Sequence, residues 1–229
     1  MTARKDRRHL SFHFCSVNGI VEAARNPELR AALAHASVAA PDGMPLVWLG
    51  WIARQRVQRV CGPDFMPALL ERGRAIGYRH FFYGGAGGVA ERLRQRMTER
   101  FPGVRVVGAE TPPFAPLTGA ENDAAIERIN AADPDCVWLG VSTPKQDIWL
   151  HENRAHIHAP VVLAVGAAFD FLSGSRARAP RWMQRSGLEW SFRLLAEPRR
   201  LGRRYTVTNL RFVGLLFRDA LARRSKTAG

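Results

Sequence analysis

The sequence predicts an α/β fold, a Rossmann-like and mostly parallel sheet flanked by helices, followed by a basic helical C-terminal appendage. Between residues 78 and 171, short apolar segments typical of buried strands alternate with segments of helical apolar spacing. The 229 residues are 46% hydrophobic, which is enough for one sizeable core. Beyond Phe171 the sequence becomes basic and aromatic. We therefore divide the chain into an α/β core at 1–175 and an appendage at 176–229.

In the first part of the chain, apolar spacing predicts mainly helices. Helices are expected at 21–36, 46–53 and 63–73, and the second of these follows a Pro-Asp-Gly turn. The first strand that the pattern predicts is 78–85, and a glycine-rich loop joins it to a helix at 89–101. A strand followed by a glycine loop and a helix is typical of a parallel sheet.

The same alternation continues through the centre of the chain. Further strands are expected at 104–110, at 135–141 and within 159–171, with helices at 121–132 and from 147 to about 156. Functional residues in such sheets gather in the loops beyond the carboxyl ends of the strands. The loops after Tyr83, Val141 and Val165 are therefore the first places to look for a site.

Positive charge is concentrated at the C-terminus. Fourteen basic and three acidic residues lie from Arg176 onward, so +11 of the formal net charge of +14 belongs to this segment. A polyanionic partner is indicated: nucleic acid, anionic lipid or a pyrophosphate. Arg204, Arg211 and Arg218 recur every seven residues beside apolar residues, as in a helix lying on an anionic membrane. A solvated basic helix packed on the core needs the same apolar stripe.

Other features of the chain bear on its compartment. There is no signal-peptide pattern, and the longest apolar run, 161–172, is interrupted by Asp170 and is too short to span a bilayer. Cys15, Cys61 and Cys136 form no metal or disulfide pattern, so we expect three buried free thiols. The sequence therefore predicts a cytoplasmic protein.

Two motifs allow a chemical and a structural interpretation. Gly85, Gly87 and Ala90, with Glu110 on the next strand, imitate a dinucleotide fingerprint and would make the chain an NAD(P)-dependent oxidoreductase. A tight strand-to-helix turn explains the same glycines. The acids of "DPD" at 133–135 precede a strand, away from the expected site, so we interpret Asp133 as a turn residue and do not expect the pair to bind a metal.

Asp42, in "AAPDGMPLVWLGW" at 39–51, poses the same choice. An Asp ahead of a helix is most often its N-cap, worth roughly 1 kcal/mol. A carboxylate at this place is also a candidate catalytic base. Its position alone leaves both roles open.

Several stretches in order carry a resemblance to a known family. They are "CSVNGIVEAARNPELRAALAHASVAAPDGMPLVWLG", "RVCGPDFMPALLE", "FFYGGAGGVAERL", "FPGVRVVG", "VWLGVSTPKQDIWL", "VGAAFDFLSGSRARAP" and "GLEWSFRLLAEPRRLGRRY". From about Phe12 to Phe212 the chain resembles the WecG/TagA/CpsF family of bacterial glycosyltransferases, glycosyltransferase family 26.

The resemblance implies an activity. Members move a sugar from a UDP-sugar to a lipid-pyrophosphate-linked sugar at the inner face of the cytoplasmic membrane, invert the anomeric centre and need no metal cofactor. The products enter cell-surface polysaccharides. The appendage is expected to help close the site and to meet the membrane. Hexoses such as N-acetylmannosamine, its uronic acid and glucose are candidate donor sugars, and a homo-oligomer is possible.

The resemblance also implies site residues. Asp42 falls on the "DG" motif, where the Asp acts as general base. The expected substrate-binding positions are Ser16 and Asn18 in the "TxN" motif, Arg59, Gly62 and Asp64 in "RVxGxD", Gly84 and Gly85 in the nucleotide pocket, Gln146 in "PKQE", and Arg193, Arg200 and Arg203 in the basic motif. Arginines suit the diphosphate of the leaving group because they bind phosphate with two donors.

The sequence departs from the family pattern at three places. Ser16 replaces the usual Thr, and Asp147 replaces a Glu, which puts a role for Asp147 in doubt. The family normally has a strand and a loop ahead of the "TxN" motif, so here the first strand is short or the start is truncated.

Nucleic acid is not an expected partner, because the arginines lack an interleaved base-stacking platform.

Overall fold

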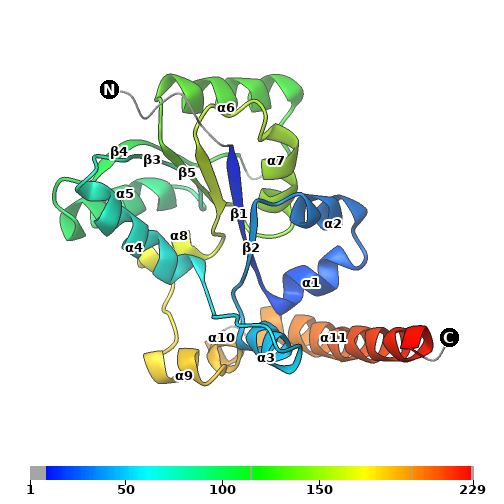
Figure 1. Ribbon diagram of the computed structural model, residues 1–229. Helices are drawn as coiled ribbons and strands as arrows, with labels where there is room; N and C mark the ends of the chain where they lie inside the picture. Colours follow the sequence, from blue (N-terminus) through cyan, green and yellow to red (C-terminus); the bar gives the residue numbers. More distant parts are fainter. Residues whose placement is uncertain (1–8, 114, 197, 228–229) are drawn as a thin grey trace.

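The computed structural model describes residues 9–113, 115–196 and 198–227, except for the side chains of 185, 200, 203, 204 and 220–227. Within them, six strands form one sheet in the order β2-β1-β6-β5-β3-β4 (Figure 1). The strands are β1 (Leu10–Cys15), β2 (Val38–Pro41), β3 (Arg79–Gly84), β4 (Arg105–Glu110), β5 (Cys136–Gly140) and β6 (Val161–Ala164). All neighbouring strands pair in parallel, which confirms the predicted fold class.

Helices cover both faces of the sheet. The helices of the predicted core are α1 (Val17–Ala23), α2 (Pro27–Ala34), α3 (Met44–Ile52), α4 (Gly62–Arg74), α5 (Val89–Arg100), α6 (Gly119–Ala131), α7 (Lys145–Asn153) and α8 (Ala168–Leu172). Successive strand residues point to opposite faces. Phe82 and Trp138 therefore pack with α4, α5 and α8, while Phe81 and Val137 pack with α6 and α7.

The predicted helix at 21–36 is wrong, because the segment forms two helices. Pro27 lacks a backbone N–H, so it suits the first position of a new helix. The Asn26 side chain caps α2 by accepting a hydrogen bond of 3.0 Å from the Leu29 N–H. The chain therefore turns sharply between α1 and α2.

Two strands were missed by the periodicity argument, β1 and β2. In β1 the buried His13 interrupts the apolar pattern, and its ring is satisfied by Asp147 at 2.8 Å. Strand β2 has only four residues and lies at the edge of the sheet, with its first two residues exposed. Strand β1 has six residues and runs directly into Ser16.

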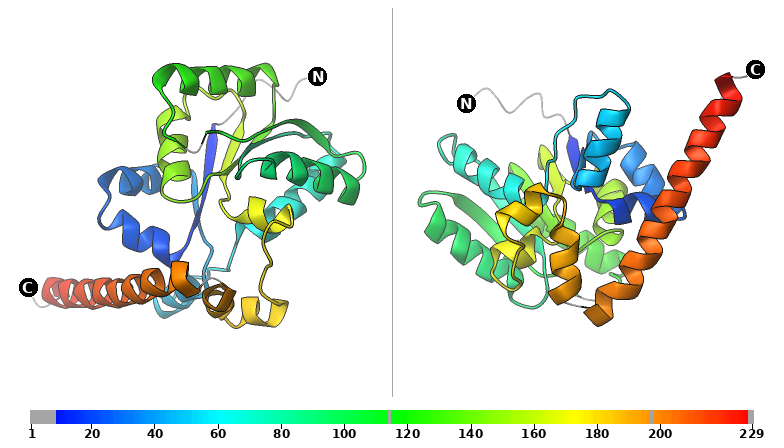
Figure 2. Two further views of the ribbon diagram at one scale, coloured as in Figure 1. Left: turned by 180° about the vertical axis from the view of Figure 1, so that it is seen from behind. Right: turned by 90° about the horizontal axis from the view of Figure 1, so that it is seen from below.

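The chain beyond residue 175 lies along one side of the molecule. It contains α9 (Arg181–Arg185), α10 (Glu189–Ala196) and the long α11 (Pro198–Thr227). The first half of α11 packs on α1, where the Thr208 hydroxyl donates a 3.4 Å hydrogen bond to Asn18 Oδ1. The other half extends past the core (Figure 2). No helix in the described ranges is long and apolar enough to cross a membrane.

Gly84 ends strand β3 at a place where the sheet leaves no room for a side chain. Its φ is +149°, and an added Cβ would lie 2.6 Å from backbone atoms of Gly140 on the neighbouring strand β5. We expect Gly84→Ala to lower the free energy of unfolding by at least about 2 kcal/mol, measured by urea denaturation.

Gly119→Ala is the matched control, because an added Cβ there meets nothing within 4 Å. That variant should unfold like the wild type. Equal stability of the two variants would show that strands β3 and β5 separate at little cost.

Candidate active site

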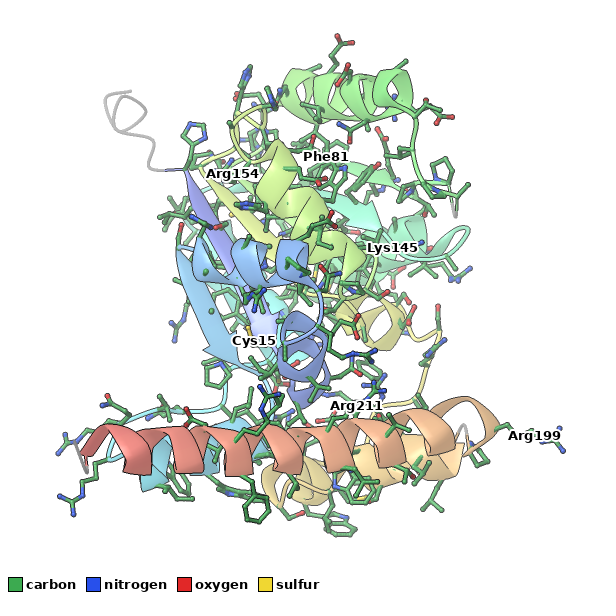
Figure 3. All side chains as sticks on the ribbon, turned by 90° about the vertical axis from the view of Figure 1, so that its right-hand side faces the viewer. Cys15, Phe81, Lys145, Arg154, Arg199 and Arg211 are labelled. Atoms are coloured by element: carbon green, nitrogen blue, oxygen red, sulfur yellow. The ribbon has the colours of Figure 1, made fainter. Side chains whose placement is uncertain are left out.

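The segments that follow the carboxyl ends of β1, β2 and β5 lie together. The Asp42 N–H, just after β2, donates a 2.8 Å hydrogen bond to the carbonyl oxygen of Cys15 at the end of β1. A Cβ on Gly19 of α1 would lie 3.8 Å from Thr143 in the loop after β5. Cys15 lies at the end of β1 on the side of the sheet that faces α11 (Figure 3). Residues far apart in sequence therefore share one edge of the sheet.

Asp42 is not a helix cap. Gly43 occupies the N-cap position of α3, and within the described chain no side chain bonds to this end of the helix. The Asp42 side chain keeps 31% of its surface exposed. Surrounding protein still displaces enough water to raise its pKa to about 7, although the nearby Arg59 guanidinium acts in the opposite direction. A group with this pKa exchanges protons readily near neutral pH.

Arg59 fixes the backbone that carries Asp42. Its Nε donates a 2.8 Å hydrogen bond to the Asp42 carbonyl oxygen, and its Nη2 lies 4.0 Å from Asp42 Oδ1. The same Nη2 donates a 2.7 Å hydrogen bond to Glu189 of α10. Arg59 thus joins the core to the appendage directly beside the candidate base.

Arg178 makes a second connection from the appendage. Its Nη2 donates hydrogen bonds to Asp64 Oδ2 at 3.0 Å and to Cys61 Sγ at 3.4 Å. Its Nε lies 3.8 Å from Glu189 Oε1. The bonded guanidinium lowers the pKa of Asp64. Asp64, predicted as a substrate contact, is therefore engaged in closing the appendage onto α4.

A cavity of about 440 Å³ lies where these segments meet. Its lining combines the charged Arg59 and Asp64 with apolar side chains of α3 and α4. The complete lining is Met44, Arg59, Val60, Cys61, Asp64, Phe65 and Gln184. Gln184 belongs to α9, so the appendage contributes to the wall. The cavity carries both charge and apolar surface next to Asp42.

Three arginines were predicted in the appendage, and the described side chains place one of them. The positive charge of Arg193 lowers the pKa of Asp42, and its guanidinium lies 5.8 Å from the centre of the Phe171 ring. Arg200 and Arg203 belong to α11, but their side chains lie outside the described residues. Arg199 points away from the sheet (Figure 3).

Sequence reasoning missed the roles of Arg178 and Glu189. The sequence assigned no role to Glu189, whereas in the structure it bonds Arg59 of the core. Arg178 stood among several arginines in "SGSRARAPRW" with no feature that separates it from its neighbours. A pairing across more than a hundred residues leaves no periodic signal.

Several residues that were predicted to contact substrate form contacts within the protein itself. Ser16 caps α1, its hydroxyl accepting a 3.3 Å hydrogen bond from the Gly19 N–H, and Asn18 bonds Thr208. Gly62 packs so closely that an added Cβ would lie 2.9 Å from the Val165 carbonyl oxygen. Gly85 follows β3 with a φ of +78°. Their roles toward substrate stay predictions.

Gln146 and Asp147 begin α7 and are both buried. Gln146 Nε2 donates a 3.1 Å hydrogen bond to the Ala164 carbonyl, and Asp147 Oδ1 lies 2.8 Å from His13 Nδ1. Each of the two side chains keeps one buried oxygen without a hydrogen-bond partner in the described structure. Asp147, in place of the family's Glu, thus ties α7 to β1.

The dinucleotide interpretation finds little support at its acidic residue. Glu110, which would hold a ribose, pairs with Arg128 at 3.0 Å. Asp133 lies in a turn, as predicted, since its N–H donates a 2.9 Å hydrogen bond to the Asn130 carbonyl oxygen. Both acids of "DPD" also bind Arg79: Asp135 accepts a 2.9 Å hydrogen bond from the Arg79 N–H, and Asp133 pairs with the Arg79 side chain. The described side chains contain no group of three His, Cys, Asp or Glu arranged for a metal ion.

The cysteines are free and buried, as predicted. Burial raises the pKa of Cys15, Cys61 and Cys136 to about 12, so the thiols stay protonated at neutral pH. Cys61 therefore serves the site as a neutral hydrogen-bond donor, to Asp64 Oδ2 at 2.9 Å.

Known proteins resemble this chain over most of its length. The chain is 30% identical over 187 residues to an N-acetylglucosaminyldiphosphoundecaprenol N-acetyl-beta-D-mannosaminyltransferase of Bacillus spizizenii, covering 81% of this chain and 71% of the relative. A model of the glycosyl transferase WecG/TagA/CpsF family matches residues 1–226. The oxidoreductase alternative is therefore set aside, and the chain belongs to the WecG/TagA/CpsF family of glycosyl transferases.

Proposed function

We propose that this protein is an inverting, metal-independent hexosyltransferase that uses a UDP-sugar as donor and a polyprenyl-pyrophosphate-linked sugar as acceptor. The observation that carries the proposal is the partly exposed Asp42 carboxyl, with a pKa of about 7, at the carboxyl edge of the sheet and beside a cluster of arginines. The family and the relative support glycosyl transfer in the synthesis of lipid-linked polysaccharides.

Asp42 acts as the general base in this proposal. The ionised carboxylate takes the proton of the acceptor hydroxyl as that oxygen forms a bond to the anomeric carbon of the donor. The bond from the anomeric carbon to the UDP oxygen breaks, and its electron pair leaves with UDP. Attack opposite the leaving group inverts the anomeric centre, so no covalent intermediate on the protein is required.

Arginines stabilise the departing diphosphate. Arg59 and Arg193 both lower the pKa of Asp42 electrostatically, so their charges act at the place where the reaction occurs. Guanidinium groups are planar and bind two phosphate oxygens at once, which suits Arg193 for this task, while Arg59 and Arg178 add positive charge nearby. Arg200 and Arg203 are assigned the same task from the family pattern. This supply of positive charge is the reason to propose a reaction without a metal cofactor.

The substrates are proposed from the relative. Its name describes transfer of N-acetylmannosamine to N-acetylglucosaminyl-diphosphoundecaprenol. We assign the same classes here, an N-acetylated hexose on UDP and a diphosphate-linked sugar on a polyprenyl lipid. The protein would work as a peripheral enzyme at the inner face of the cytoplasmic membrane, with the basic α11 on anionic lipid, as a monomer or a homo-oligomer.

The central test compares the wild type with Asp42→Asn. The amide keeps the size of the side chain but cannot accept the proton, so we expect acceptor-dependent UDP release to fall at least about 100-fold. UDP release is measured with a panel of UDP-sugars and a sugar acceptor on a short, water-soluble lipid diphosphate.

Asp123→Asn on α6 provides the matched control, because it makes the same chemical change at an exposed position on a helix remote from Asp42 in sequence. It should keep wild-type turnover. Equal turnover by the Asp42 variant would remove Asp42 as the base, and absence of turnover by the wild type with every donor would contradict the proposed reaction.

The pH dependence of kcat/KM offers a second test. Asp42 must be ionised to act as a base, so the rate should fall as the pH drops below about 7. The negative charge of Glu189 raises the pKa of Asp42 and the positive charge of Arg193 lowers it. Glu189→Gln should therefore move the acidic limb to lower pH, and Arg193→Gln should move it to higher pH.

Opposite shifts distinguish electrostatics from structural damage. A variant that merely loosens the appendage loses rate without moving the limb in a direction set by the charge removed. Limbs that stay in place in both variants would show that Asp42 does not control the profile.

A further inference from the structure

Helix α3 presents apolar side chains to solvent as well as to the core. Val47 is 1% exposed, whereas Trp48, Trp51 and Ile52 are 43%, 57% and 79% exposed. Positions 48, 51 and 52 are spaced to lie on one face of a helix. A helix on the surface of a globular protein normally shows a polar outer face, so this apolar face, called here the α3 face, indicates a binding surface.

The α3 face is held rigidly. The Trp51 Nε1–H donates a 3.1 Å hydrogen bond to the Val57 carbonyl oxygen, so the polar atom of this indole is satisfied within the protein. Gly50 packs directly on Val57, where an added Cβ would collide with the Val57 side chain. The following segment is therefore fastened to α3, and the apolar part of the indole faces outward without a need for further rearrangement.

The appendage extends the apolar surface. A Cβ on Gly187 would lie 3.1 Å from Met44 and 3.2 Å from the Trp48 ring, so the junction of α9 and α10 packs on the start of α3. Leu188, directly after this contact, and Trp182 and Trp190 on the adjoining helices are exposed. In Figures 1 and 2, α3, α9, α10 and α11 lie along the same side of the molecule.

The charge around the α3 face favours an anionic partner. Residues 43–63 contain no Asp or Glu, and Arg54 and Arg56, just after α3, are exposed. Arg181 is exposed at the start of α9. Tryptophan side chains favour the boundary between lipid and water, and nearby arginines favour anionic headgroups. A second protein with an acidic rim is less favoured, because a bilayer already contains the acceptor of the proposed reaction.

We propose that the α3 face inserts into the surface of an anionic bilayer and forms a membrane contact of the catalytic core, separate from the contact assigned to α11. The role that we give to this membrane contact rests on the proposed function. Asp42 stands two residues before Met44, the first residue of α3. Insertion of α3 therefore holds the candidate base at the level of the headgroups, where the diphosphate-linked sugar of a membrane acceptor lies.

The test uses the full chain and a double variant, Trp51→Ser with Ile52→Ser. Binding to phosphatidylglycerol-containing vesicles is measured by co-sedimentation, and we expect affinity to fall at least roughly tenfold. Transfer to an acceptor embedded in those vesicles should fall in parallel. Transfer to the water-soluble acceptor should equal that of the wild type, because neither residue lines the cavity.

Ile76→Ser is the matched control. Ile76 is 69% exposed and lies between α4 and β3. It is therefore at the amino end of a strand, whereas Asp42 and α3 follow the carboxyl end of β2. It should bind vesicles like the wild type. Equal binding by the control and the double variant would overturn the proposal. So would a double variant that binds vesicles normally but changes its oligomeric state in light scattering, since the face would then join two copies of the chain.

A second readout does not depend on how the double variant folds. Brominated phospholipid in the vesicles quenches indoles that enter the bilayer, and Trp51→Phe should remove part of the quenching seen with the wild type. Quenching unchanged by Trp51→Phe would contradict insertion. A wild type that binds vesicles through α3 but transfers no sugar to the soluble acceptor would refute the proposed function and leave the membrane contact standing.

Discussion

The site depends on one side chain, Arg59, which lies between the carboxylates of Asp42 in the core and Glu189 in the appendage. It holds the Asp42 carbonyl oxygen from one side and the Glu189 carboxylate from the other. This position fixes the turn that carries the candidate base and fastens the appendage over it. Because Arg59 lowers the pKa of Asp42 while Glu189 and the loss of water raise it, the same contacts set both the shape and the proton affinity of the site.

The parallel sheet makes such contacts possible. When every strand runs the same way, all loops that follow strands meet at one edge, whatever their separation in sequence. Asp42 thus lies beside the end of β1, and the loop after β5 contacts α1. The appendage closes the arrangement through Arg178 and Glu189, two residues that bind the core and each other.

How far the sequence predicts this structure depends on the kind of signal. Strands β3, β4, β5 and β6 were predicted because buried strands in a parallel sheet are nearly continuous apolar runs. Strand β1 was not predicted, because His13 interrupts its apolar pattern and is buried with a partner that only the fold supplies. The break between α1 and α2 was not predicted either, because the apolar spacing continues past Pro27. Asp42 could be named only through its motif. Arg178 and Glu189 pair across the two parts of the chain, which no local pattern records.

The docking of α11 on α1 has a mechanical consequence. One unbroken helix of 30 residues, about 45 Å long, packs on α1 through its first half, near Thr208, and ends well beyond the core. The helix is therefore stiff and does not act as a flexible linker. A surface that binds the outer half of α11 therefore fixes the orientation of the whole molecule. It also fixes the direction in which the cavity beside Asp42 opens.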